Sequence, residues 1–161
     1  MYRIALVCLG NICRSPMAHV VLEERLAVAG LGDRVEVTSA GTGDWHAGQP
    51  MDRRAAAVLQ EAGYDPSRHI ARTFTIDWYA ENDLLLAMDE SNYANMAELS
   101  PTVASLAKLR MFRAFDPQSC AGDIEVPDPW YGGDHGFQDV HAMVERTVDG
   151  LMAALPELIE P

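Results

Sequence analysis

The chain has 161 residues, of which 48% are hydrophobic and 22% charged, so it is long enough for one substantial core and short for two domains. This composition is typical of a folded globular protein and lacks the low hydrophobicity of disordered chains. The net charge of −12 argues against nucleic acid or an anionic membrane as the main partner, because both are negatively charged themselves. We therefore predict a single domain over residues 1–161, which works as a monomer and binds neither nucleic acid nor a membrane.

Short apolar runs alternate with segments of helical periodicity along the chain. The predicted strands are 3–7, 35–39, 84–88 and 108–112. The predicted helices are 16–29, 52–62, 90–99 and 138–155, and Pro156 is expected to stop the last of them. Alternation of this kind favours an α/β fold with one open parallel sheet of about four strands and helices on both of its faces.

The three cysteines, Cys8, Cys13 and Cys120, cannot all pair in a disulfide framework. The apolar run after Met1 is too short for a signal peptide or a membrane span, so we expect a reduced, cytoplasmic protein. Cys8 and Cys13 lie on one short segment, where Cys13 could capture an oxidised Cys8 as a reversible disulfide. Simple packing of Cys13 beneath that segment is an equally good interpretation, because geometry decides between the two.

The most informative segment is 7–16, Val-Cys-Leu-Gly-Asn-Ile-Cys-Arg-Ser-Pro, between the first predicted strand and the first predicted helix. The N–H groups and the positive dipole at a helix N-terminus stabilise a thiolate, here that of Cys8. The same N–H groups can hold the oxygens of a phosphate dianion, and the planar guanidinium of Arg14 can bind two of them at once. We therefore predict a nucleophilic, phosphate-binding loop after the first strand, in preference to a buried structural cysteine.

Residues 9–13 suit a tight cradle for an anion. Gly10 permits backbone conformations that are closed to other residues, and Asn11 tolerates the left-handed region. Ser15 is the expected N-cap of the following helix, with Pro16 at its first position, and the Ser15 hydroxyl can also donate to the thiolate. The residues predicted to surround the phosphate are Leu9, Gly10, Asn11, Ile12, Cys13 and Ser15.

Five further motifs accompany the loop: Thr-Ser-Ala-Gly-Thr at 38–42, Trp-His at 45–46, His-Ile-Ala-Arg at 69–72, Met-Asp-Glu-Ser-Asn at 88–92 and Asp-Pro-Trp-Tyr-Gly at 128–132. Together with the loop they resemble the low molecular weight protein tyrosine phosphatase family, in the order in which the family has them. The resemblance covers most of the chain. It implies a hydrolase of phosphotyrosine-containing proteins that forms a phosphocysteine at Cys8, with a cognate tyrosine kinase as a second partner.

Departure of a phenoxide from phosphorus is easier when an acid donates a proton to it. Asp128 is the strongest candidate for that acid, because prolines on both sides hold it in an extended conformation and glycines follow it. Taken alone, an Asp-Pro pair is usually a turn. The resemblance implies that Asp128 is the general acid and then the base that activates water, whereas Asp134 is an outside candidate with no counterpart in the family.

Aromatic side chains are expected to wall the entrance to the loop. Trp45, Trp130 and Tyr131 lie in two Gly- and Pro-containing loops, and a slot between their rings would stack on a phenol ring. Such a slot favours phosphotyrosine over phosphoserine. The family commonly has tyrosine where this chain has Trp130 and an acidic residue where it has His19, so substrate preference and the charge near the mouth can differ here.

The resemblance also implies a set of supporting side chains. Asn11, Ser39 and His69 match positions whose hydrogen bonds hold the strained shape of the loop in the family, and Asp89 matches a recurrent aspartate to which we assign a structural role. Other histidines, such as His46, lack the spacing to cysteines or carboxylates that a metal site requires. We therefore predict no metal and no cofactor.

Two other functions are compatible with a Cys-x5-Arg loop. A thioredoxin-coupled arsenate reductase on the same scaffold needs a relay of further cysteines, and residues 72–100 contain none. A phosphocysteine carrier module accepts and passes on phosphate without hydrolysing it, and it has little need of Arg14 or of a general acid. Both remain alternatives to the phosphatase.

Overall fold

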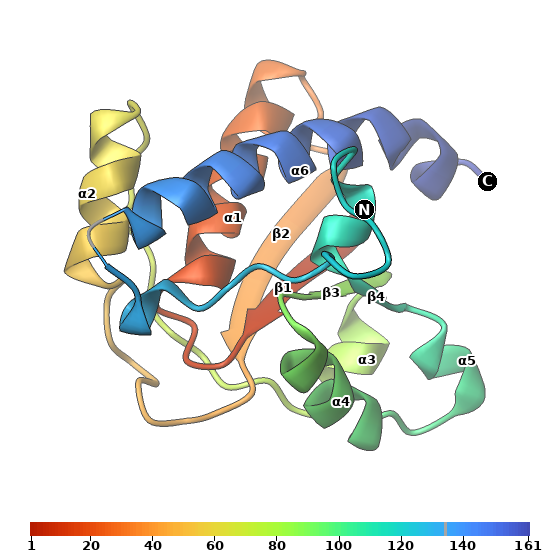
Figure 1. The fold of residues 1–161 in the computed structure, drawn as a ribbon. Coiled ribbons are helices and arrows are strands. Elements are labelled where there is room, and N and C mark those ends of the chain that lie inside the picture. Colours follow the sequence, from red (N-terminus) through yellow and green to blue (C-terminus); the bar gives the residue numbers. More distant parts are fainter. Residues whose placement is uncertain (134) are drawn as a thin grey trace.

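The computed structural model describes residues 1–133 and 135–161. Four parallel strands form one sheet in the order β2-β1-β3-β4 (Figure 1), which confirms the predicted sheet. The strands are β1 (Tyr2–Cys8), β2 (Val35–Gly41), β3 (Leu84–Ala87) and β4 (Leu109–Met111). The strands at the centre of the sheet are apolar and buried, as expected where helices cover both faces of a parallel sheet.

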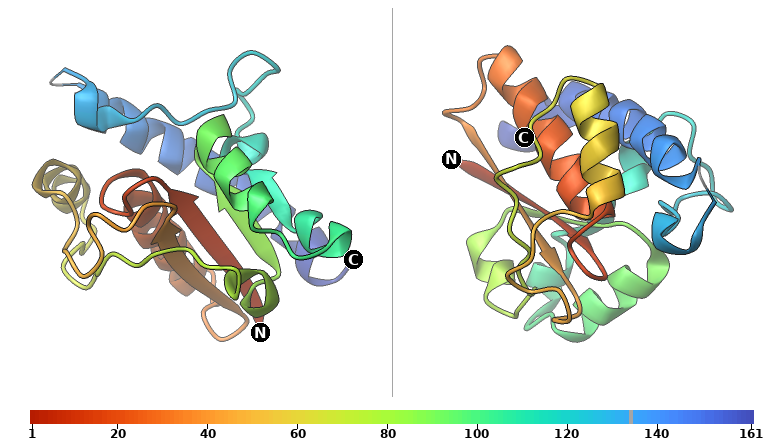
Figure 2. Two further views of the ribbon diagram at one scale, coloured as in Figure 1. Left: turned by 90° about the horizontal axis from the view of Figure 1, so that it is seen from below. Right: turned by 90° about the vertical axis from the view of Figure 1, so that its left-hand side faces the viewer.

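Six α-helices and two 3₁₀ turns connect and cover the strands in the described part of the chain. The helices are α1 (Arg14–Val28), α2 (Arg53–Glu61), α3 (Trp78–Glu81), α4 (Glu90–Glu98), α5 (Val103–Leu106) and α6 (Gly136–Ile159), and the 3₁₀ turns are η1 (Phe112–Phe115) and η2 (Pro129–Tyr131). Figures 1 and 2 show α1, α2 and α6 on one side of the sheet and α3 and α4 on the other.

The two faces of the sheet bury separate apolar cores because successive strand residues point to opposite sides. On one face Ile4 and Leu6 pack with α1 and α6, and on the other Ala5 and Val7 pack with Tyr79 and Met96 of α3 and α4. Burial of each large side chain contributes roughly 1.5–3 kcal/mol. The rigid centre of the sheet therefore fixes the end of β1, where the loop begins.

The predicted end of the last helix at Pro156 is wrong, because α6 continues to Ile159. A proline in the last turn removes one backbone hydrogen bond, and the backbone N–H of Glu160 still donates to the Pro156 carbonyl. Leu155 is buried, and Leu158 and Ile159 pack against the same core. Tertiary packing thus holds the final turn in spite of the proline.

The predicted N-cap at Ser15 is also wrong. Helix α1 begins at Arg14, and Cys13 stands at its N-cap position without a side-chain capping bond. Pro16 is therefore the third helical residue, where its missing N–H is still one of the unpaired first-turn donors. The Ser15 hydroxyl faces the Cys8 sulfur instead of the helix end.

The carboxyl ends of all four strands meet at one edge of the sheet. β1 has β2 on one side and β3 on the other, so the connection after β1 runs toward β2 and the connection after β3 runs the opposite way, toward β4. Such a switch point of strand order is the usual ligand site in open α/β sheets. No helix in residues 1–133 and 135–161 combines the length and apolar character needed to cross a membrane.

Candidate active site

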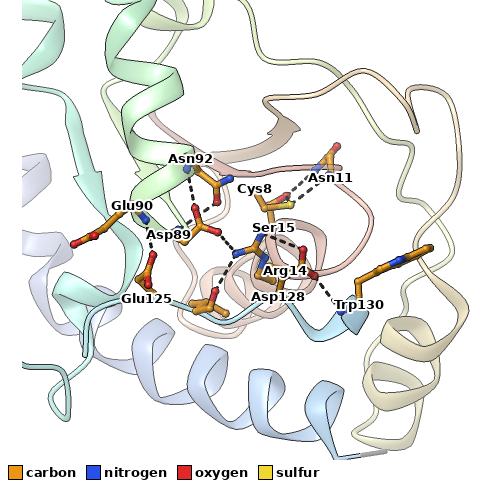
Figure 3. A network of polar contacts seen from close by, with 11 residues as sticks. Cys8, Asn11, Arg14, Ser15, Asp89, Glu90, Asn92, Glu125, Asp128 and Trp130 are labelled. Atoms are coloured by element: carbon orange, nitrogen blue, oxygen red, sulfur yellow. Dashed lines mark hydrogen bonds and ion pairs between the residues drawn. The ribbon is translucent and has the colours of Figure 1, made fainter. Parts of the chain in front are cut away.

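The loop at the end of β1 curls around the sulfur of Cys8. Cys8 is buried, the backbone N–H of Asn11 donates to its Sγ over 3.3 Å, and the Ser15 hydroxyl lies 3.0 Å from the same sulfur (Figure 3). When Cys8 is a thiolate, both groups act as donors to it, which stabilises the negative charge. The loop therefore holds the Cys8 sulfur in place and surrounds it with hydrogen-bond donors from the protein.

Asn11 supports the loop from the inside. Its backbone has a φ of 57°, the left-handed region, which costs free energy unless surrounding contacts hold it. Its side-chain amide donates to Ser15 Oγ at 2.8 Å and its Oδ1 accepts the Arg72 N–H at 2.9 Å. The Asn11 carbonyl lies 2.6 Å from Nε2 of His69. Each polar group of Asn11 thus has a partner, and together they maintain the strained conformation.

His69 contributes to this network as a neutral ring. Burial lowers the pKa of His69, so the uncharged form is favoured and its Nε2–H can donate to the Asn11 carbonyl. The structure therefore brings Asn11 and His69 together, as the family resemblance implies. His69 lies outside the pocket that contains Cys8.

Ser39 does not join the network with Asn11 and His69 that the resemblance implies. The Ser39 hydroxyl lies 3.2 Å from Nδ1 of His19, a residue one helical turn after Ser15 on α1. Within the described part of the chain, the Ser39 side chain forms no hydrogen bond with Asn11 or His69. Hydrogen bonds from His19 and then Arg68 lower the pKa of Glu23 to about 2. His19 therefore tethers β2 and Glu23 on the flank of α1 and lies away from the mouth, because it does not line the Cys8 pocket.

Arg14 is almost fully buried and held by two acceptors. Its Nη1 donates to Asp89 Oδ2 at 2.6 Å and to the Val126 carbonyl at 2.9 Å, and its Nη2 lies 3.7 Å from Asp128 Oδ2 (Figure 3). Burial alone would lower the pKa of Arg14, but the Cys8 sulfur and the two carboxylates raise it overall. The guanidinium is thus permanently charged and fixed in orientation beneath the pocket.

Asp89 has a second task besides holding Arg14. It is the N-cap of α4: its Oδ1 accepts the Asn92 N–H at 2.7 Å, and the Asn92 side chain accepts the Asp89 N–H in return. The two carboxylate oxygens therefore fix a helix start and the guanidinium at once. Our prediction gave Asp89 only a structural role, although an Asp-x-x-Asn capping pattern directly after a buried strand marked it as a residue of the ligand edge.

Asp128 stands at the start of η2, on the far side of the pocket from α4. Its Oδ1 accepts the Trp130 N–H at 3.0 Å, and its side chain is 30% exposed. The other oxygen faces Arg14 across 3.7 Å. Asp128 thus has one oxygen held by its own turn and one directed toward the Arg14 guanidinium. Asp134 lies outside the described residues.

A pocket of about 290 Å³ opens over the loop. It is lined by Cys8, Leu9, Gly10, Ile12, Cys13, Arg14, Trp45, His46, Asp128, Trp130 and Tyr131. The polar groups of Cys8, Arg14 and Asp128 meet in this pocket, and Trp45 and Tyr131 are 68% and 85% exposed at its rim. The sequence reasoning missed His46 as a lining residue, although it adjoins Trp45 in a quoted motif.

Cys13 lines the same pocket, but its surroundings disfavour the thiolate form. Burial raises the pKa of Cys13, and the negative charges of Asp52, Cys8 and Asp128 raise it further. All three cysteines are free, and Cys120 is exposed. Residues 1–133 and 135–161 contain no group of three or more His, Cys, Asp or Glu side chains arranged to hold a metal ion.

Comparison with known proteins places this site in a family. The profile described as "Low molecular weight phosphotyrosine protein phosphatase" matches residues 3–159. The chain belongs to the low molecular weight phosphotyrosine protein phosphatase family. As a member of this family it is an enzyme that hydrolyses phosphoric monoesters.

Relatives in the family match nearly the whole chain. A low molecular weight protein-tyrosine-phosphatase of Streptomyces coelicolor is 46% identical over 159 residues, 99% of this chain and 96% of that protein. Low molecular weight protein-tyrosine phosphatase A of Mycobacterium tuberculosis is 43% identical over 148 residues, 92% of this chain and 88% of that protein. A crystal structure of a protein tyrosine phosphatase from Entamoeba histolytica has a TM-score of 0.91 at 32% identity, with 98% of each chain covered. The α/β fold is therefore that of solved phosphatases.

Proposed function

We propose that this phosphatase hydrolyses phosphotyrosine in proteins through a phosphocysteine on Cys8, with Arg14 binding the phosphate and Asp128 acting as general acid and then base. The observation that carries the proposal is the meeting of these three side chains in one pocket with an aromatic rim. The names of the relatives support the substrate class.

In the first step the Cys8 thiolate attacks phosphorus and the bond from phosphorus to the phenolic oxygen breaks. The electron pair of that bond goes to the departing oxygen, which takes a proton from the Asp128 carboxyl group. Asp128 Oδ2 faces the phosphate site, whereas Oδ1 is held by the Trp130 N–H. Asp128 lines the same pocket as Cys8, which supports its role as the proton donor to the departing oxygen.

In the second step the Asp128 carboxylate takes a proton from water while the water oxygen attacks phosphorus. The bond from phosphorus to sulfur breaks, and inorganic phosphate and the Cys8 thiolate are released. The Ser15 hydroxyl, 3.0 Å from Sγ, donates to the departing sulfur and so makes it a better leaving group. One aspartate thus serves both steps by changing its protonation state.

The phosphate is bound by local groups rather than by the field of the whole protein. The chain carries a net charge of −12, so its long-range field repels anions. Successive backbone N–H groups of residues 9–13 and the charged edge of Arg14 provide the opposing attraction at short range. Leu9, Gly10, Ile12 and Cys13 line the pocket, while Asn11 and Ser15 support the loop from behind.

The aromatic rim favours a phosphorylated tyrosine. Trp45, Trp130 and Tyr131 border a pocket whose floor is the Cys8 loop. A phenol ring presents two faces for stacking on such a rim, whereas a phosphoserine side chain has no ring. Trp130, which replaces the tyrosine common in the family, keeps an aromatic wall at this position.

The two alternative functions receive less support. An arsenate reductase needs a relay of cysteines, but Cys120 does not line the pocket, and Cys13 is buried with a raised pKa. A phosphocysteine carrier has little need of a proton donor, yet the carboxyl group of Asp128 lines the same pocket as Cys8. We propose further that residues 1–161 form one catalytic domain that acts as a cytoplasmic monomer without metal or cofactor, on proteins phosphorylated by a tyrosine kinase.

The test is hydrolysis of matched phosphotyrosine and phosphoserine peptides in the presence of a chelator. Wild type, Cys8→Ser and Asp128→Ala are compared, and a phosphoenzyme is trapped by rapid denaturation. Phosphate release from the phosphotyrosine peptide alone, dependent on Cys8, supports the proposal. Stable phosphorylation of Cys8 without turnover in the wild type would favour the carrier, and full activity of Cys8→Ser would exclude the phosphocysteine.

A further inference from the structure

Arg54, in the first turn of α2, packs against two aromatic rings from the other end of the chain. Its guanidinium carbon lies 5.1 Å from the ring centre of Trp130 and 4.6 Å from that of Phe137 in α6. Guanidinium groups over an indole face are attracted by the negative face of the ring. Figure 3 shows the Trp130 side chain extending from η2 toward α2. The turn η2, which begins at Asp128, is therefore in contact with α2.

The guanidinium of Arg54 is also linked, through Asp52, to the loop that follows β1. Its Nε and Nη2 lie 3.3 and 3.2 Å from the two carboxylate oxygens of Asp52, whose side chain is only 10% exposed. Asp52 also caps α2 by accepting the backbone N–H groups of Arg54 and Ala55. Its own N–H donates to the Ile12 carbonyl at 2.8 Å. The guanidinium thus rests on a carboxylate that is fixed to the loop.

On its other side, the contact of Arg54 with Trp130 leads to Asp128, the proposed general acid. The Trp130 N–H donates to Asp128 Oδ1 at 3.0 Å, and the Trp130 ring also lies 5.9 Å from the ring of His46, centre to centre. Trp130 is 42% exposed and stands on a three-residue 3₁₀ turn, so its own turn holds it weakly. A displacement of the indole would move the backbone N–H that orients the Asp128 carboxyl group.

We propose that Arg54 is a positioning residue: by holding Trp130 against α2 it fixes Asp128 over the Cys8 sulfur and keeps the aromatic wall closed. This inference rests on the proposed function. Arg54 does not line the pocket, so it acts through Trp130 and not by contact with the phosphate. The planar fork of arginine suits both tasks, because it binds the Asp52 carboxylate with one edge and stacks on rings with its face.

The test compares Arg54→Met and Arg54→Lys with Arg53→Met as the matched control. Arg53 is the exposed neighbour on the same helix and, within the described residues, makes no ion pair and no contact with a ring. The substrates are phenyl phosphate, whose leaving group needs a proton, and 4-nitrophenyl phosphate, whose leaving group departs readily without one. Because loss of general acid catalysis costs 10²–10⁴-fold, we expect misplacement of Asp128 to lower kcat/KM for phenyl phosphate, which reports the steps up to departure of phenol, by about 10-fold.

The expected result is that both Arg54 variants lose kcat/KM on phenyl phosphate, lose much less kcat/KM on 4-nitrophenyl phosphate, and keep the wild-type inhibition by inorganic phosphate. In the Trp130→Leu background, Arg54→Met should have little further effect, because the ring that it holds is gone. Equal losses on both substrates, weaker inhibition by phosphate, or the same loss in Arg53→Met would overturn the inference. These outcomes leave the proposed function standing, which fails only if the wild type shows no Cys8-dependent hydrolysis.

Discussion

Asp89 Oδ2 and Arg14 Nη1 lie 2.6 Å apart, and they join the start of α4 to the start of α1 beneath the pocket. The pair brings together residues from the ends of β3 and β1, which are neighbours in the sheet. Asp89 has no freedom to move with Arg14, because its other oxygen caps α4. The orientation of the Arg14 guanidinium is therefore set by the sheet and not by the loop alone.

Replacement of Asp89 by alanine is expected to impair both stability and catalysis. Loss of the α4 cap should lower the free energy of unfolding by about 1 kcal/mol. Release of the Arg14 guanidinium should also lower kcat/KM by about 10²-fold, the usual cost of a misplaced catalytic group. Urea denaturation and steady-state kinetics measure the two effects. Thr102→Ala removes the cap of α5, away from the pocket, and should destabilise without loss of kcat/KM.

Substitution of Arg14 by lysine tests the shape of the cation rather than its charge. An ammonium group can still pair with Asp89 but cannot offer two parallel N–H groups to a phosphate. We expect kcat/KM to fall by about 10²–10³-fold, as when an anion-stabilising donor is removed from other enzymes. Kinetics with a phosphotyrosine peptide give the answer, with thermal unfolding as the control for folding. Activity within threefold of the wild type would contradict the bidentate role of Arg14.

Alkylation should discriminate among the three cysteines. Burial raises the pKa of Cys13, so at neutral pH it is a protonated thiol and should resist iodoacetamide, whereas exposed Cys120 should react. Cys8 opens into the pocket and should react in a manner that inorganic phosphate slows. Peptide mass spectrometry after timed labelling measures all three sites. Labelling of Cys13 at the rate of Cys120 would show that the pocket does not shield it.

The loop between β1 and α1 could be predicted from sequence because all its parts are contiguous. Cys8, the N–H groups of residues 9–13 and Arg14 lie within a single turn between a strand and a helix, so local rules suffice to bring them together. The strand pattern was equally accessible, since continuous apolar runs between helices identify a parallel sheet. The bounds of the strands agree with the prediction to within two residues.

Contacts between distant segments could not be predicted in the same way. Asp89 and Arg14 are 75 residues apart, and their meeting depends on the placement of β3 next to β1, which periodicity does not encode. Ser39 bonds His19 because of how β2 packs on α1, and the same reasoning applies to Arg54 and Trp130. Local signals also failed at Pro156, where packing of the final turn outweighs the intrinsic preference of proline to end a helix.

The loss of stability at acid pH should depend on Asp116, which is buried between α6 and η1. Burial opposes its ionisation, but hydrogen bonds from Arg146, from the Gln118 N–H and from Arg113 lower the pKa of Asp116 to about 2. The carboxylate is therefore favoured in the folded state. The unfolded chain, with the ordinary aspartate pKa near 3.9, binds the proton more readily as the pH falls.

The sign of the effect follows from this difference in proton binding. The stabilisation is complete above pH 4 and is lost as the pH falls through the lowered pKa near 2, with a total of about 2 kcal/mol. Asp116→Asn should abolish this part of the pH dependence and lower stability at pH 7 by about 3 kcal/mol, because buried Arg113 loses a counter-charge. Urea denaturation from pH 2 to 7 measures both, with exposed Asp33→Asn as the control. If the free energy of unfolding of Asp116→Asn falls at acid pH as much as that of the wild type, the loss of stability belongs to other carboxylates.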